Sequence, residues 1–160
     1  MMNKYIKSLL SFRYLSNFTI ISAFIAYYTN AYTFFFTTIP ILIANLIIIV
    51  LIQWYNSDEL LNGIFNNSNV DPKSIKFEFI VINTIWHIIP LYWVYSVLQH
   101  DNIIKIFKPN FMAIFFQSLV IVIPYYYYII QLQIYGKINY LCYGAVYLFS
   151  LLIATIILFT

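Results

Sequence analysis

Residues 34–54 read FFFTTIPILIANLIIIVLIQW, an apolar run without a charged residue. Backbone polar groups inside a bilayer must be hydrogen-bonded within the protein, so a run of this kind forms either a helix or a strand of a closed barrel. Barrel strands alternate apolar and polar residues, and the run from Ile41 to Val50 shows no alternation. Because about 20 helical residues cross roughly 30 Å of hydrocarbon, this stretch predicts a membrane-spanning helix.

Four more stretches have a similar character. They lie at about 12–28, 77–98, 111–132 and 138–159. With 34–54 they predict an all-α, polytopic integral membrane bundle of about five transmembrane helices, forming one membrane domain with a polar loop at 56–76. The first stretch is the weakest, because Arg13, Ser16 and Asn17 lie near its start. If it lies in the membrane interface, four spans remain.

The composition agrees with a lipid environment. The 160 residues are 63% hydrophobic and 8% charged, whereas soluble domains carry about 25% charged residues. The net charge is only +3, and the basic residues are scattered and form no stripe, so we expect no nucleic-acid partner. The single cysteine, Cys142, excludes an internal disulfide.

The basic residues predict an orientation. With five spans, six of them fall on the side of the N-terminus and two on the other side. The two sets are Lys4, Lys7, Arg13, Lys73, Lys76 and Lys137 against Lys105 and Lys108. Because Lys and Arg accumulate on the cytoplasmic side of membranes, we expect the N-terminus on the cytosol- or matrix-equivalent side.

Three prolines fall inside predicted spans. Pro40, Pro90 and Pro124 are tolerated there because membrane helices re-satisfy the freed carbonyl groups locally. Pro90 and Pro124 are expected to kink their helices. Pro72 is expected in a loop, and Pro109 lies just before the fourth span.

A histidine, His87, lies at the midpoint of the third span. An ionisable group at this depth is costly and normally has a partner or a task. Asn83, four residues earlier, and Pro90, three residues later, fall on the same helix face. The structural interpretation, which we prefer, is a neutral imidazole bonded to Asn83 or to a neighbouring helix. The functional interpretation is a proton-relay or ligand-binding histidine beside a helix break.

Two further polar residues are possible partners of this stripe. Asn45 lies mid-span in the second helix and is a candidate partner for His87 or Asn83. Glu78 lies near the start of the third span, where we expect an interfacial, solvated carboxylate.

Neither a cofactor nor a metal is expected. The only other histidine, His100, lies about 20 Å along the helix from His87 at 1.5 Å per residue, so the two cannot hold one haem. The sequence has no Cys, His, Asp and Glu cluster with the spacing of metal ligands. No catalytic motif is present either, and enzymatic activity is not expected.

Aromatic residues near the span ends predict a belt at the membrane interface, where an apolar ring with a polar edge is favoured. The four consecutive tyrosines point in different directions on a helix and so cannot line one pocket. The predicted interface aromatics are Trp54, Trp93, Tyr125, Tyr126, Tyr127 and Tyr128.

The segment from about Tyr14 to Val94 resembles small, uncharacterised multi-pass membrane proteins of large nucleocytoplasmic DNA viruses. The resemblance rests on an N-terminal helical hairpin and on a third helix in which Asn83, His87, Pro90, Leu91 and Tyr92 match a common pattern. Lysine is usual at the position of His87. The resemblance implies a viral membrane protein and no particular chemistry.

These observations predict a structural or assembly-type membrane protein, a component of a viral or host-derived membrane. Its partners would be the lipid bilayer and other membrane subunits or further copies of itself. One alternative is an organelle-encoded subunit of a mitochondrial respiratory complex in the inner membrane, because the residue usage suggests an A/T-rich genome. Another is an oligomeric channel or proton-coupled transporter that uses His87.

Overall fold

The computed structural model describes residues 15–55, 57–58, 61–62, 72–100, 103, 110–132 and 139–159. Its main elements are the helices α2 (Leu15–Tyr28), α3 (Tyr32–Tyr55), α5 (Pro72–His100), α7 (Phe111–Leu132) and α8 (Tyr140–Phe159). The expected all-α fold is confirmed for this part of the chain. Four of these helices, α3, α5, α7 and α8, are long and apolar enough to cross a membrane.

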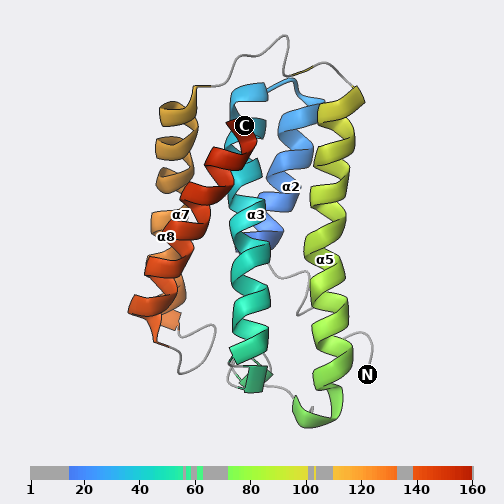
Figure 1. Ribbon diagram of the computed structural model, residues 1–160, viewed down its shortest axis with the longest axis vertical. Helices are drawn as coiled ribbons and strands as arrows, with labels where there is room; N and C mark the ends of the chain where they lie inside the picture. Colours follow the sequence, from blue (N-terminus) through green and yellow to red (C-terminus); the bar gives the residue numbers. More distant parts are fainter. Residues whose placement is uncertain are drawn as a thin grey trace.

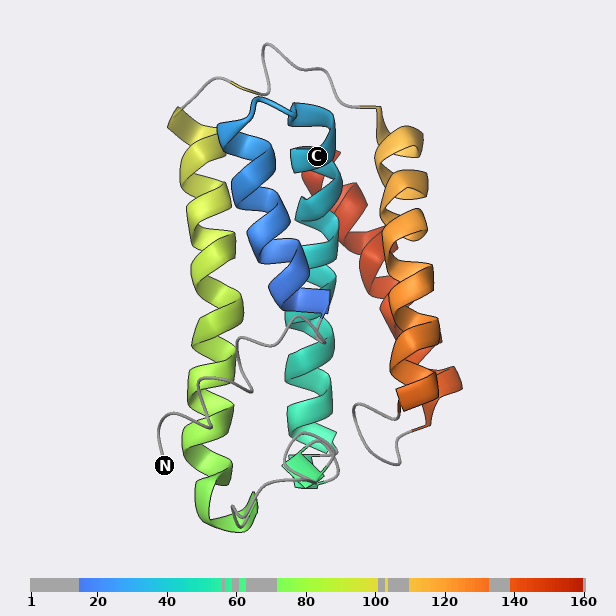
Figure 2. The same ribbon diagram turned by 180° about the vertical axis from the view of Figure 1, so that it is seen from behind.

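Helix α3 lies at the centre of the bundle. Helices α2 and α5 lie on one side of it and α7 and α8 on the other, with consecutive helices running in opposite directions (Figure 1, Figure 2). In the candidate spans, 72% of α3 is buried, compared with 28% of α5, 22% of α7 and 33% of α8. The outer helices therefore leave most of their span surface for lipid or for neighbouring proteins.

Helix α2 is shorter than the others. Its 14 described residues extend about 21 Å at 1.5 Å per residue, less than the roughly 30 Å of a hydrocarbon core. The helix runs alongside α3 and α5 rather than across the end of the bundle (Figure 2). Ala23 and Ala26 are buried on its inner face, which allows close packing of neighbouring backbones.

A tight turn at Thr29 and Asn30 joins α2 to α3. The amide of Ala31 donates to the carbonyl of Ala26 (2.8 Å) and that of Asn30 to the carbonyl of Tyr27 (3.1 Å), which is the Schellman pattern of a helix C-terminus. Asn30 has a φ of 58°. Asparagine tolerates this left-handed conformation better than most residues, so the residue type explains where α2 ends.

Sequence signals also mark the other helix ends. Asn110 and Asn139 cap α7 and α8, because their side-chain oxygens accept from the amides of Ala113 and Cys142, both at 3.1 Å. Pro72 was expected in a loop, and this was wrong: it is the first residue of α5, where its missing N–H costs no helical hydrogen bond. Helices α3, α5 and α7 continue through their internal prolines.

The apolar core has two parts. One lies where the end of α2 and the start of α3 meet the second half of α5, and the other where α3 meets α7 and α8. Phe35, Phe36 and Ile41 of α3 are almost completely buried. The central helix thus contributes to both parts and joins the two halves of the bundle.

Candidate functional site

The predicted polar stripe lies inside the bundle. Asn83 and His87 are each 6% exposed, and Pro90 is also buried. All three belong to α5 and face the interior with Phe79, Val94 and Val97. The structure therefore places the only ionisable side chain of the middle of α5 away from lipid.

The imidazole of His87 is held by its own helix. Its Nδ1 lies 2.7 Å from the main-chain oxygen of Asn83. The partner is thus Asn83, as the structural interpretation expects, although the acceptor is the carbonyl group and not the side-chain amide. A carbonyl oxygen can only accept, so Nδ1 carries a proton, and in the neutral ring Nε2 is left as an acceptor.

Asn45 pairs across the bundle with α8. Its Oδ1 accepts a hydrogen bond of 2.6 Å from the hydroxyl of Tyr147, and both residues are buried. Within the described part of the chain, Asn45 forms no hydrogen bond with Asn83 or His87. Asn45 therefore connects α3 to α8, and the structure does not bring it together with the stripe as a bonded pair.

Two other interhelical hydrogen bonds flank the stripe, and neither is predicted by the sequence pattern. The hydroxyl of Thr84 donates to Oε1 of Gln53 on α3 at 3.2 Å. The indole of Trp86 donates to Oδ1 of Asn17 on α2 at 2.9 Å. The signal was present, because Asn17 and Gln53 are polar residues inside apolar helices, but sequence spacing does not identify partners on other helices.

Three buried amide nitrogens have no hydrogen-bond partner in the described structure: Nδ2 of Asn45, Nε2 of Gln53 and Nδ2 of Asn83. Each unpaired donor costs roughly 1–3 kcal/mol relative to a satisfied one. The interior of the bundle therefore retains hydrogen-bonding capacity on α3 and α5.

The charged groups near the start of α5 lie at the surface. Glu78 is exposed, in agreement with an interfacial carboxylate. Lys76 forms an ion pair of 3.0 Å with Asp58, and both side chains are partly or largely exposed. Exposed pairs of this kind contribute about 1 kcal/mol or less. No described carboxylate is paired with His87.

The predicted interface aromatics have different surroundings. The half-buried ring of Trp93 stacks on Phe24 with a centroid distance of 4.0 Å and also contacts Tyr27 and Phe35. It therefore packs α5 against the α2–α3 hairpin. Trp54 belongs to α3, but its side chain lies outside the described part of the structure.

The four consecutive tyrosines of α7 also differ in their surroundings. Tyr127 and Tyr128 are exposed, at 65% and 42%, and their place at the membrane interface stays a prediction. The ring of Tyr125 packs against that of Phe18 on α2, with ring centroids 5.5 Å apart. Tyr126 points toward α8, where its hydroxyl donates to the carbonyl of Tyr140 and its ring stacks on Tyr143.

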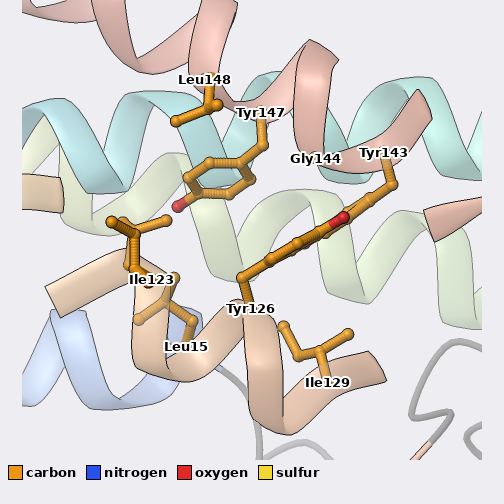
Figure 3. Close-up of a pocket in the computed structure, with 9 residues that line it drawn as sticks. Leu15, Ile123, Tyr126, Ile129, Tyr143, Gly144, Tyr147 and Leu148 are labelled. Atoms are coloured by element: carbon orange, nitrogen blue, oxygen red, sulfur yellow. The ribbon is translucent and has the colours of Figure 1, made fainter. Parts of the chain in front are cut away.

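A small cavity lies beside Tyr126 (Figure 3). Its volume is about 80 Å³, and its walls come from α7, α8 and the first residue of α2. The residues that line it are Leu15, Val122, Ile123, Tyr126, Ile129, Tyr143, Gly144, Tyr147 and Leu148. As expected, only one of the four consecutive tyrosines reaches it.

For the residues that the structure describes, the fold and these contacts define the class of protein: an all-α helical bundle with four helices of membrane-spanning length. No protein-family model, curated protein or solved structure matches the chain. The described residues contain no group of three or more His, Cys, Asp and Glu side chains placed to hold a metal ion.

Proposed function

We propose that this chain is a structural or assembly-type membrane protein. The observation that carries the proposal is that polar side chains within the helices are used to join helices. Asn45 bonds to Tyr147, Gln53 to Thr84 and Asn17 to Trp86. In the same way, Thr37 of α3 donates to Gln117 of α7 at 2.8 Å. Polar groups that hold a bundle together support a scaffold more directly than a reaction site.

The outer surface supports association with neighbours. Large apolar side chains such as Ile89, Tyr92 and Tyr95 of α5 are 59–73% exposed, and α7 carries a similar face at Phe116, Val120 and Ile123. These faces suit lipid, other membrane subunits or further copies of the chain. We propose a viral or host-derived membrane as the location, supported by the resemblance at Asn83, His87 and Pro90.

Association in native membranes tests this proposal. The full chain, extracted in a mild detergent, should sediment as an assembly of several chains, either self-associated or with other membrane proteins. A double substitution of exposed residues, Tyr92→Ser and Tyr95→Ser, should reduce the assembly and leave the helix content unchanged. Recovery of the unmodified chain as a monomer from its native membrane would contradict the proposal.

One observation favours a second candidate, an oligomeric channel or proton-coupled transporter. His87 is buried at mid-span, and Asn83 and Gln53 on adjacent helices carry amide donors without partners. Such groups line proton and ion pathways in other membrane proteins. A flux that depends on His87 in reconstituted vesicles would favour this candidate over a structural role.

A further inference from the structure

The cavity between α7 and α8 lies within both candidate spans, Phe111–Gln131 and Tyr140–Ile157. It is partly open to the surface of the bundle. Two of its wall residues, Ile123 of α7 and Leu148 of α8, are 58% and 48% exposed and so form its outer edge. Each lies eight residues inside the nearer end of its span, about 12 Å at 1.5 Å per residue, so in a membrane the medium at that edge is hydrocarbon.

The chemistry of the walls selects an apolar occupant. Apart from the tyrosines, the lining is aliphatic or glycine. The hydroxyl of Tyr126 is bonded to the carbonyl of Tyr140, and that of Tyr147 to Asn45. Both groups are thus already used inside the protein. A sugar, an ion or a polar headgroup would lose its own hydrogen bonds on entering this space.

The size of the cavity further limits which apolar molecules can occupy it. Pockets for drug-sized ligands and cofactors have volumes of about 300 Å³ or more, whereas this one has about 80 Å³. Its volume suits a short length of an unbranched hydrocarbon chain. The remaining part of such a chain would lie along Ile123 and Leu148.

The inner wall is held firmly in shape. A Cβ atom at residue 144 would lie 2.5 Å from Oη of Tyr126, so the absence of a side chain at Gly144 lets this ring pack directly on α8. The Tyr126 ring also stacks on Tyr143, with centroids 6.1 Å apart and planes inclined by 8° (Figure 3). Because this aromatic wall is fixed, a hydrocarbon chain in the cavity would be held in one position and would not adopt many.

We propose that this cavity is a binding site for one acyl chain of a membrane phospholipid. Burial there brings no hydrophobic gain over the bilayer, since lipid tails are as apolar as the walls. Recognition therefore depends on the fit of the chain and does not involve the headgroup. The proposal requires that α7 and α8 span a membrane and that lipid, not a neighbouring chain, lies against Ile123 and Leu148. It does not rest on the proposed structural role.

Photolabelling of the full chain in phosphatidylcholine vesicles tests the proposal. A small fraction of the lipid carries a diazirine at the middle of one acyl chain, and adducts are located by mass spectrometry after irradiation. We expect adducts at Tyr126 and Tyr143 to exceed those at Val81 and Ile82, which are exposed on α5, lie at a similar distance from the end of their span and do not line this cavity. Equal labelling of both sets, or equal labelling of the cavity by a headgroup diazirine, would overturn the proposal.

Substitutions that fill the cavity provide a second part of the photolabelling test. Leu148→Phe should lower the yield at Tyr126 and Tyr143 by about tenfold, because overpacking opposes entry of the chain. Leu152→Phe is the matched control, one turn further along α8 and not part of the cavity lining, and should leave the yield unchanged. If Leu148→Phe does not fold, Ile123→Phe with Val120→Phe as its control replaces this pair. An unchanged yield in a folded, cavity-filling variant would overturn the proposal.

Discussion

Nδ1 of His87 lies 2.7 Å from the main-chain oxygen of Asn83, one turn earlier in α5. This contact ties the mid-span imidazole to its own helix backbone. It satisfies Nδ1 without a charge partner, and it leaves Nε2 as the only nitrogen of the neutral ring that can accept a hydrogen bond.

The first prediction concerns the tautomer of His87. In lipid at neutral pH, ¹⁵N NMR should show His87 with a protonated Nδ1 and an unprotonated Nε2, because the carbonyl of Asn83 can only accept. The spectrum of His87→Gln identifies the signals, since His100 is the only other histidine. A ring with its proton on Nε2 would contradict the observed contact.

The second prediction concerns the bond between α3 and α8. Tyr147→Phe should lower the free energy of unfolding in detergent by roughly 0.6–1.7 kcal/mol, the average and the maximum found for hydrogen bonds between membrane helices by double-mutant cycles. It also leaves both polar atoms of the buried Asn45 side chain unpaired. A double-mutant cycle with Asn45→Leu isolates the pair. A coupling energy of zero would mean that this hydrogen bond does not stabilise the bundle.

The third prediction concerns the packing of Trp93. Trp93→Ala should destabilise the bundle by about 3 kcal/mol, at the lower end of the range for large aromatic truncations, because the ring is half-buried and stacks on Phe24. Phe77→Ala is the control on the same helix, since Phe77 is 80% exposed. Denaturant unfolding measures both variants. Equal losses would show that Trp93 acts as a belt residue only.

The fourth prediction concerns the close approach of α7 and α8. Gly144→Ala should destabilise the protein by about 1–3 kcal/mol, because its Cβ would lie 2.5 Å from the Tyr126 hydroxyl oxygen and 2.7 Å from Cζ. In a Tyr126→Ala background the same substitution should cost little. Thermal unfolding of the four proteins checks this. A similar loss in both backgrounds would mean that the ring of Tyr126 is not the obstacle.

The long helices were predictable from the sequence, because bilayer thickness and backbone hydrogen bonding leave few structures open to a long apolar run. The turn at Asn30 was predictable for a local reason, the tolerance of asparagine for positive φ. The hydrogen bond of His87 to Asn83 was within reach because residues four apart in a helix share a face.

The partners across the bundle were not predictable. Tyr147 is 102 residues from Asn45, and no local spacing connects them. Hydropathy also fails to separate the inner and outer faces of these helices, because lipid and protein interior are both apolar. For this reason Tyr126 and Trp93 were grouped with the belt, although one contacts α8 and the other packs against the α2–α3 hairpin.

Proton flux into vesicles tests most directly whether the buried polar residues have a structural role or serve transport. The full chain is reconstituted with a pH-sensitive dye inside the vesicles, and proton uptake is followed under an imposed pH gradient and potassium diffusion potential. A structural role predicts the same rate as in protein-free vesicles, for the unmodified chain and for His87→Ala alike. A rate above that of protein-free vesicles that His87→Ala abolishes would contradict the structural role and establish transport.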